Sequence, residues 1–274
     1  MSTGKIIYQG VPGSYSYEAM LKYFGDNITF EHKEFFGDVF KEVSLKKADY
    51  GVVPVENSTT GGVNEVFDLL SAYDQCFICG EICLEITHHL MSIKSTNLDN
   101  IKKVYSHPQA LNQCKDYIRA MNFEAIPASN TAASAKLIQE KNDPTFSAIG
   151  SLMAAKFYDL KILSSKINNY FNNITKFIVI THQMNYDKTA NKISLILVTP
   201  HQPGALYEAL GCFAKNKINI LKLESRPIKD VPWQYSFFVD IEGNLQHPNI
   251  MQALEDLKKI CPSYKILGNY KPSS

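Results

Sequence analysis

The sequence lacks several features that mark whole classes of protein. Its 28 basic and 27 acidic residues leave a net charge of +1, which gives no general field for nucleic acid or a membrane surface. No apolar run reaches the roughly 18 residues that a membrane helix requires. Residues 1–5 lead directly into a strand-like run without a secretory signal. We therefore expect a cytoplasmic protein whose six cysteines are reduced thiols.

Metal and nucleotide motifs are also missing. Cys76, Cys79 and Cys83 have C-x2-C-x3-C spacing, but no fourth ligand follows at a suitable distance and the segment is rich in apolar residues. We interpret these thiols as small hydrophobic side chains. The turn Gly10–Ser16 has G-x-x-G spacing, which is not the dinucleotide fingerprint.

The sequence does contain a regular alternation of strands and helices. It occurs in two stretches, before and after about residue 80, and predicts a mainly parallel α/β region of two lobes with a cleft between them. Residues 77–90 are expected to form one long extended run. A single helix is expected from Pro108 to about Met121, with Ser106 as its cap.

The pattern changes after a polar linker at residues 182–191. Between Ile193 and Leu267 the order is strand, helix, strand, strand, helix, strand, which is the ferredoxin-like split unit. Such a small domain has one bare sheet face and exposed edge strands, so pairing with a second copy is expected. The predicted domains are residues 1–182 and 192–270.

Three polar segments stand where a ligand site is expected. The turns Gly10–Ser16 and Glu56–Gly62 each join a strand to a helix N-terminus, where anions and other ligands bind in α/β sheets. The third is Asn172–Phe177, where a hydroxyl, a cation and an aromatic ring enter a buried strand and could serve a small anionic substrate. Thr-Lys-Phe is also an ordinary strand start. His88 and His89 lie in an extended run, where a histidine is more often a hydrogen-bonded structural group.

Motifs in these segments, taken in order, carry a resemblance to one family. The chain resembles monofunctional prephenate dehydratase, a two-lobed catalytic region similar to periplasmic binding proteins, followed by an ACT domain. The motifs that carry the resemblance are Gly10–Ser16, Gly51–Ser58, Ile86–Leu90, Ser106–Leu111, Asn173–Phe177, Gly204–Leu206 and Glu224–Pro227. Position 176 is Lys where the family usually has Arg, and Gly13-Ser14-Tyr15 replaces the usual Gly-Thr-Phe. No long all-helical segment precedes the catalytic region, so no fused chorismate mutase is expected.

The resemblance implies a reaction and a set of residues. Family members convert prephenate to phenylpyruvate with release of water and carbon dioxide, without a cofactor. The implied roles are Thr175 as hydrogen-bond donor to the departing hydroxyl, Lys176 facing a carboxylate, and Phe177 packing on the ring or holding the loop. The implied substrate contacts are Ser14, Glu56, Asn57, Ser58, Asn130 and Thr131, with His107 and Gln109 orienting the wall of the site.

The ACT domain resemblance implies binding of L-phenylalanine as a feedback inhibitor at a dimer interface. The residues implied are Gly204, Ala205, Leu206, Glu224, Ser225 and Arg226, and for Arg226 a structural ion pair is the favoured role. A homodimer or homotetramer is expected, without nucleic acid or membrane partners. Two other functions stay open: arogenate dehydratase, and a catalytically weak ligand-sensing module.

Overall fold

The computed structural model describes residues 4–170, 172–184, 187–229 and 231–273. The chain divides into two compact units, one formed by residues 1–39, 52–62 and 83–177 and the other by residues 40–51, 63–82 and 178–274. No helix in the described part of the chain is both long and apolar enough to cross a bilayer.

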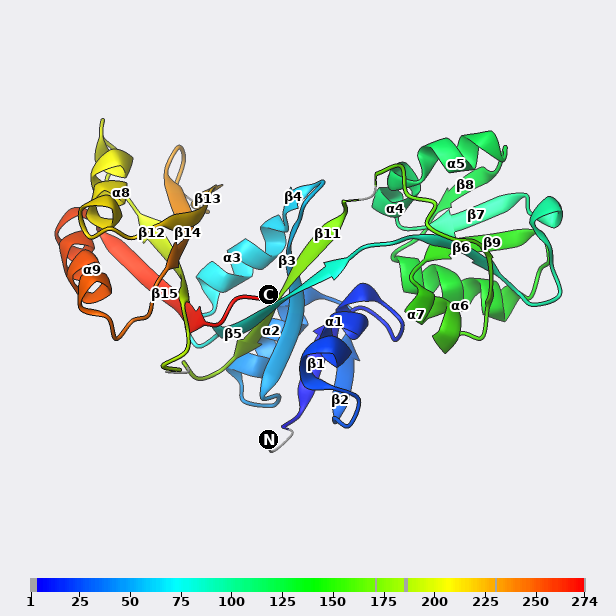
Figure 1. The fold of residues 1–274 in the computed structure, drawn as a ribbon, viewed down its shortest axis with the longest axis horizontal. Coiled ribbons are helices and arrows are strands. Elements are labelled where there is room, and N and C mark those ends of the chain that lie inside the picture. Colours follow the sequence, from blue (N-terminus) through cyan, green and yellow to red (C-terminus); the bar gives the residue numbers. More distant parts are fainter. Residues whose placement is uncertain (1–3, 171, 185–186, 230, 274) are drawn as a thin grey trace. The chain divides into compact units, whose positions relative to one another are not determined.

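The first sheet carries the strands that end at the predicted polar segments. Its order is β2-β1-β3-β11-β5, with the short β4 paired to β3 (Figure 1). The strands are β1 (Ile6–Gln9), β2 (Phe30–Lys33), β3 (Tyr50–Asn57), β4 (Gly61–Gly62), β5 (Phe77–Glu85) and β11 (Ile174–Thr181). The helices that follow β1, β2 and β4 are α1 (Tyr15–Phe24), α2 (Phe36–Ser44) and α3 (Asn64–Ala72). β3 and β11 are neighbours, which brings residue 57 and residue 175 together.

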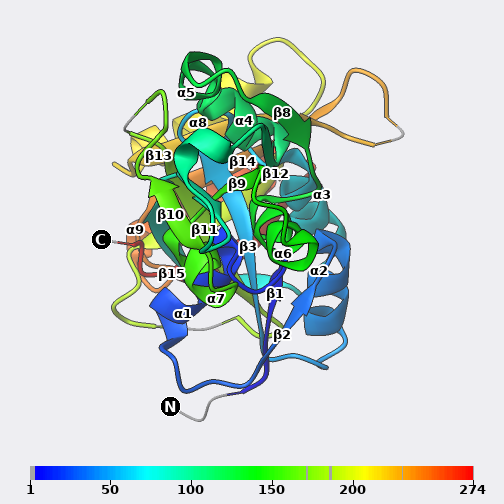
Figure 2. The same cartoon turned by 90° about the vertical axis from the view of Figure 1, so that its right-hand side faces the viewer.

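The second sheet lies in the first unit and is covered on both faces. Its order is β10-β6-β9-β7-β8. The strands are β6 (His89–Ser92), β7 (Lys103–Ser106), β8 (Glu124–Pro127), β9 (Phe146–Gly150) and β10 (Lys161–Ser164), with the short 3-10 helix η1 (Leu98–Asn100) before β7. One face packs on α4 (Pro108–Gln113) and α5 (Lys115–Ala120), and the other on α6 (Thr131–Lys141) and α7 (Leu152–Phe157), as Figures 1 and 2 show.

Four local predictions for this unit are corrected. β6 pairs antiparallel with β9 and β10, so this sheet is mixed rather than mainly parallel, because strand direction is not encoded in local periodicity. The run 77–90 divides into two strands in different sheets, since the amide of Ile86 bonds to Asn173 outside any strand ladder. The predicted helix 108–121 breaks at Cys114 into α4 and α5. His107, not Ser106, caps α4.

The C-terminal part has the predicted ferredoxin-like order. The elements are β12 (Lys192–Val198), α8 (Ala205–Lys215), β13 (Ile220–Pro227), β14 (Tyr235–Glu242), α9 (Pro248–Ile260) and β15 (Ser263–Tyr270). The sheet order is β13-β14-β12-β15, and neighbouring strands run antiparallel. Both helices cover one face of this sheet, where Leu195, Phe213 and Leu257 are fully buried (Figure 1). The α/β class with a ferredoxin-like domain is thus confirmed.

The sequence predicted that the other face of this sheet is bare. The structure shows that this face is covered. Helix α3 of the same unit contacts it: the Phe67 and Phe238 rings are 4.8 Å apart, and Asp68 accepts from Arg226 at 3.1 Å. Lys265 donates to the carbonyls of Leu70 and Tyr73 at the end of α3. A sequence pattern cannot show that a helix from 150 residues upstream covers this face.

Candidate active site

The junction of β3 and β11 is occupied by a group of buried polar side chains. Asn57, the last residue of β3, is 7% exposed, and Thr175, the second residue of β11, is 9% exposed. Asn57 Nδ2 donates to Thr175 Oγ1 at 2.8 Å and to Asn173 Oδ1 at 2.7 Å. Three predicted polar positions therefore meet, although two of them are more than 110 residues away from the third in the sequence.

The orientation of the Asn57 amide is forced by backbone. Its Oδ1 accepts from the N–H groups of Thr59 and Thr60 at 3.0 and 3.2 Å. A backbone N–H can only donate, so the amide oxygen must face these two residues and Nδ2 must face Thr175. The turn after β3 thus presets a donor aimed at the Thr175 oxygen.

This orientation decides what the Thr175 hydroxyl can do. A hydroxyl has one proton to donate and lone pairs that accept. Asn57 occupies the accepting side of Thr175, so the hydroxyl proton remains for another group. Among the described residues, no hydrogen bond donated by Thr175 Oγ1 is present. The arrangement makes Thr175 a positioned donor whose acceptor is not a side chain of this site.

The amide network extends onto α4. Because Asn173 Oδ1 faces Asn57, its Nδ2 donates to Gln113 Oε1 at 3.0 Å. Gln113 Nε2 then donates to Thr59 Oγ1 at 3.1 Å, and Thr59 Oγ1 donates back to Asn57 Oδ1 at 2.6 Å. Gln109 Nε2 donates to Thr60 Oγ1 at 3.1 Å. The loop after β3 is therefore held by α4, which is the orienting role predicted for Gln109.

The network ends at His88 and Tyr15. His88 is 2% exposed, its Nε2 lies 2.9 Å from Gln113 Oε1, and its Nδ1 lies 3.0 Å from the Tyr15 hydroxyl. Burial lowers the pKa of His88 to about 4, against a raising effect of the Gln113 hydrogen bond, so the ring is neutral at pH 7. Burial also raises the pKa of Tyr15 well above its usual value, which keeps its proton in place.

Lys176 lies on the opposite face of β11 from Thr175, whereas Phe177 lies on the same face. Successive side chains of a strand point to opposite faces. Lys176 accordingly pairs with Glu56 at 3.3 Å, one step along both strands from the Asn57–Thr175 pair. Phe177 is 2% exposed and belongs to the core. The structure therefore supports an anchoring role for Phe177 over contact with a substrate ring, and a charge pair between β3 and β11 for Lys176.

The remaining predicted substrate contacts fall into two groups. Ser58 hydrogen-bonds to the β11 segment, with Oγ donating to the Asn172 carbonyl at 2.9 Å, so it fixes the same strand junction. Ser14 and Asn130 cap the N-termini of α1 and α6, and His107 caps α4. Thr131 is the first residue of α6. Among the described residues, Ser14, Asn130, Thr131 and His107 form no hydrogen bond with Thr175.

Sequence reasoning missed the interior of the network. Gln113 was not among the predicted residues, Tyr15 was noted only as a departure from a motif, and His88 was assigned a structural role. The signal that could have found Gln113 is its spacing: it lies four residues after Gln109, and i, i+4 residues share one helix face.

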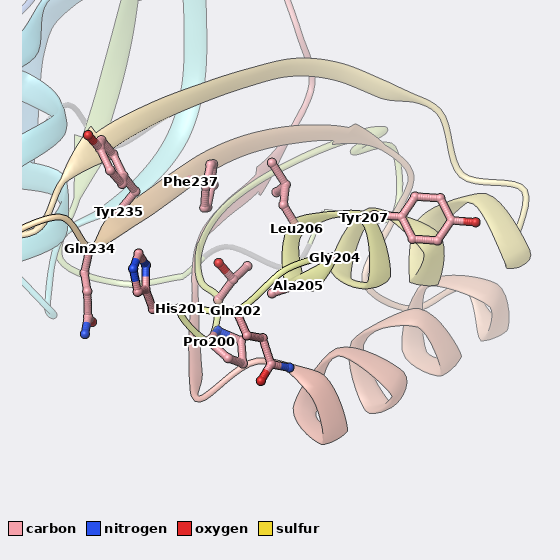
Figure 3. Close-up of a pocket in the computed structure, with 11 residues that line it drawn as sticks. Pro200, His201, Gln202, Gly204, Ala205, Leu206, Tyr207, Gln234, Tyr235 and Phe237 are labelled. Carbon is pink, nitrogen blue, oxygen red and sulfur yellow. The ribbon is translucent and has the colours of Figure 1, made fainter.

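The C-terminal unit contains a separate pocket of 380 Å³ beside the N-terminus of α8. Figure 3 shows Pro200, His201 and Gln202 on the loop before α8, with Tyr235 and Phe237 contributed by β14. Of the predicted effector residues, Gly204, Ala205 and Leu206 line it. Glu224, Ser225 and Arg226 lie on β13 outside the lining, and Arg226 forms the ion pair with Asp68 that was the favoured prediction.

Comparison with known proteins identifies the chain. Residues 6–185 match the family described as prephenate dehydratase, and residues 193–259 match the ACT domain. A bifunctional chorismate mutase/prephenate dehydratase of Aquifex aeolicus is 38% identical over 97% of this chain and 73% of its own length. The structure of a prephenate dehydratase from Arthrobacter aurescens in complex with L-Phe has a TM-score of 0.90, 27% identity, and covers 97% of this chain and 90% of its own.

A structure described as GqqA, a novel type of quorum-quenching acylase, is also similar, with a TM-score of 0.88, 27% identity and 98% of each chain covered. The family match spans more than half of the sequence, and the resemblance seen in the motifs is confirmed. The chain belongs to the prephenate dehydratase family and carries a C-terminal ACT domain.

Proposed function

We propose that Thr175 is the hydrogen-bond donor in the decarboxylating dehydration of prephenate to phenylpyruvate, the activity of this family. The observation that carries the proposal is the Asn57 amide, which donates to Thr175 Oγ1 at 2.8 Å and leaves the hydroxyl proton free. A family member needs one donor at the departing oxygen, and this is the buried donor that the β3–β11 junction provides.

The reaction balances without an added reagent. The bond between the ring and its carboxylate breaks and releases carbon dioxide, and its electron pair becomes a ring double bond. The ring hydroxyl leaves with the electron pair of its C–O bond and takes up one proton, which solvent supplies, so that it departs as water. A positioned acid typically contributes about 10²–10⁴-fold to the rate. Thr175 is a weak acid, and we therefore assign it a hydrogen bond that strengthens as negative charge develops on the leaving oxygen.

The two carboxylates of the substrate need donors or cations. We propose the N-termini of α1 and α6, where Ser14, Asn130 and Thr131 lie, because free backbone N–H groups and the helix dipole favour anions there. Lys176 keeps its predicted role only if its ammonium leaves Glu56 when substrate binds. Glu56, Ser58, His107 and Gln109 are proposed to shape the site rather than to react.

The test is a pair of substitutions at Thr175 with a matched control on the same strand. Thr175→Val removes the hydroxyl at constant shape, and we expect kcat to fall by at least about 10²-fold. Thr175→Ser keeps the donor and should retain most of the turnover. Thr181→Val is the control, because Thr181 is equally buried at 8% and lies at the other end of β11. Near-normal phenylpyruvate formation by a folded Thr175→Val protein would refute the role.

Other activities are separated by the same assay. Arogenate has an amino group where prephenate has a keto oxygen, so turnover of both substrates decides between them. A ligand-sensing module would bind prephenate without forming phenylpyruvate. Acyl transfer by a Ser, Thr or Cys nucleophile needs a neighbouring base. The ring nitrogens of His88 contact Tyr15 and Gln113, and those of His107 and His89 accept from backbone N–H groups, so these contacts do not pair a histidine with an acyl-transfer nucleophile.

We further propose that residues 1–182 form the catalytic domain and residues 192–270 the regulatory domain, inhibited by L-phenylalanine. Support comes from the 380 Å³ pocket at α8 and from the L-Phe complex of the Arthrobacter relative. Two exposed apolar side chains, Tyr207 in the pocket lining at 81% and Leu223 on β13 at 43%, are proposed to contact a second copy in a homodimer or homotetramer. A cytoplasmic location stays a prediction.

The regulatory proposal is tested on the full-length protein. Leu206→Asp places a charge in the pocket, and we expect unchanged basal turnover with loss of inhibition by L-phenylalanine. Glu242→Lys, at the far end of β14, is the control for a charge change elsewhere in the domain. Sedimentation with and without L-phenylalanine measures the oligomer. Full inhibition of the Leu206→Asp protein would place the effector elsewhere.

A further inference from the structure

We infer that His88 and Tyr15 are positioning residues, which hold Gln113 in the orientation that the chain of hydrogen bonds to Thr175 requires. The inference rests on the proposed role of Thr175. Neither side chain donates to or accepts from Thr175 itself. They act through Gln113, Asn173 and Asn57.

The direction of this chain of hydrogen bonds follows from its fixed end at Asn57. At one end the backbone N–H groups of Thr59 and Thr60 require that Asn57 present its Nδ2 to Asn173. Asn173 must then present its own Nδ2 to Gln113, so that Gln113 Oε1 is an acceptor. The nitrogen facing this oxygen, His88 Nε2, must therefore carry a proton. A ring protonated only on Nδ1 would set two lone pairs against each other at 2.9 Å.

Tyr15 contacts the other nitrogen of His88 and does not choose the tautomer. Its hydroxyl lies 3.0 Å from His88 Nδ1 and 2.8 Å from the carbonyl oxygen of Thr87. In a neutral ring protonated on Nε2, Nδ1 is an acceptor, and Tyr15 divides its one proton between Nδ1 and the Thr87 carbonyl. In the opposite tautomer the Tyr15 oxygen would accept from Nδ1–H. Gln113 therefore selects the tautomer, and Tyr15 supplies the donor that Nδ1 then requires.

The backbone of His88 is also held in place. The amide of His88 donates to Asn168 Oδ1 at 2.6 Å, and its carbonyl accepts from Ile167 N at 3.0 Å. The Tyr15 ring lies edge-on to the imidazole with 5.8 Å between centroids. A histidine that only filled the core would not need hydrogen bonds at both ring nitrogens, as His88 has with Gln113 and Tyr15. The chain Tyr15–His88–Gln113 is built to hold a neutral imidazole with a defined tautomer.

The first experiment reads the tautomer without using activity. Long-range ¹H–¹⁵N NMR on protein labelled at histidine should show His88 neutral at pH 7 with its proton on Nε2. Tyr15→Phe removes the donor to Nδ1 and should move the Nδ1 resonance toward that of a free acceptor nitrogen. An imidazolium, a proton on Nδ1, or an Nδ1 resonance unaffected by Tyr15→Phe would overturn the inference.

The second experiment separates positioning from stability. Gln at position 88 can place an N–H₂ where Nε2 stood, whereas the shorter Asn reaches only the place of Nδ1. We expect His88→Gln to keep kcat within about threefold, and His88→Asn to lower kcat roughly tenfold with KM changed less than twofold. His89→Asn is the matched control, because His89 is 3% exposed and its Nδ1 accepts only from the Lys166 backbone.

These outcomes are distinct from failure of the proposed function. If Thr175→Val is fully active, the role of Thr175 is wrong whatever His88 does. If Thr175→Val is inactive but His88→Asn and His88→Gln have equal kcat, Thr175 keeps its role and the positioning inference is overturned. Equal loss of kcat in His89→Asn and His88→Asn would also overturn it, because the effect would then be general to buried histidines.

Discussion

Replacing Asn57 by Asp is the most informative single change, because it keeps the shape of the side chain while it reverses the direction of hydrogen bonding and adds a negative charge. The side chains have the same shape. Oδ1 would still accept from Thr59 and Thr60, but the group facing Thr175 would change from a donor to a negatively charged acceptor. The Thr175 proton, now free for the substrate, would turn toward the new carboxylate.

The size of the effect follows from that one hydrogen bond. A hydrogen bond to a charged group is worth about 1.5–3 kcal/mol. This bond must be broken before Thr175 can donate to the leaving oxygen, so kcat should fall roughly 10- to 150-fold, since about 1.4 kcal/mol is tenfold in rate. Asn173 Oδ1 would lose its donor at 2.7 Å, and an unsatisfied buried acceptor costs about 1–3 kcal/mol of unfolding free energy.

Asn244→Asp is the matched control for stability without chemistry. Asn244 is 2% exposed, its Oδ1 accepts from Gln246 N at 3.0 Å, and its Nδ2 donates to two backbone carbonyls. The same substitution there removes the same kind of donor from the ferredoxin-like domain. We expect comparable loss of unfolding free energy in urea but unchanged kcat without effector.

The assay is formation of phenylpyruvate from prephenate between pH 5 and 8, with circular dichroism to confirm folding. A protonated carboxyl regains one donor, so the deficit of Asn57→Asp relative to wild type should shrink as the pH falls. If a folded Asn57→Asp protein keeps kcat within threefold of wild type at pH 7.5, the amide does not control Thr175 and the reasoning fails.

Three further predictions concern stability and each uses an unfolding measurement. Burial holds the pKa of His88 at about 4, below its unfolded value near 6.5, so the folded state binds fewer protons than the unfolded state between these pH values. The unfolding free energy should therefore fall by up to roughly 3 kcal/mol as the pH drops from 6.5 to 4. The His88→Gln protein should lack this pH dependence. Asp68→Asn should lower the unfolding free energy by about 1 kcal/mol, because it removes the partly buried ion pair with Arg226. An unchanged unfolding free energy would show that this ion pair makes no net contribution to stability. Gly268→Ala should destabilise the protein strongly, because the new Cβ would lie 2.0 Å from the Ile78 carbonyl oxygen. Gly211→Ala in α8 meets nothing within 4 Å and should stabilise the protein by about 0.5–1 kcal/mol. A Gly268→Ala protein more stable than the Gly211→Ala protein would contradict this packing.

The sequence predicted the elements well where local chemistry determines them. The strand before the Glu56–Gly62 turn, the helix after the Gly10–Ser16 turn and the ferredoxin-like order all follow from periodicity and turn residues within a few positions. The errors occurred where distant contacts decide. The extended run at 77–90 looks continuous, but Ile86 and His88 bond to Asn173 and Asn168, which end one strand and displace the next.

The candidate site shows the same contrast between features set by the local sequence and features set by distant contacts. Asn57, Asn173 and Thr175 could be found because each lies in a polar segment at a strand end. Gln113 and His88 lie 25 residues apart and belong to a short helix and a strand connection, so only the tertiary fold brings them within 2.9 Å. No local pattern distinguishes such a histidine from one that merely fills the core.

The position of Lys176 explains why the departure from the usual family Arg need not disturb the reaction. Neighbouring residues of a strand project to opposite faces, so the ammonium pairs with Glu56 while the Thr175 hydroxyl meets Asn57. An Arg offers a planar fork for bidentate carboxylate binding, whereas a Lys offers a point charge, and joining β3 to β11 through one carboxylate requires only the charge. The two rows of contacts between these strands therefore have separate tasks. One row holds the strands in register by charge, and the other sets the direction in which a single hydroxyl donates its proton.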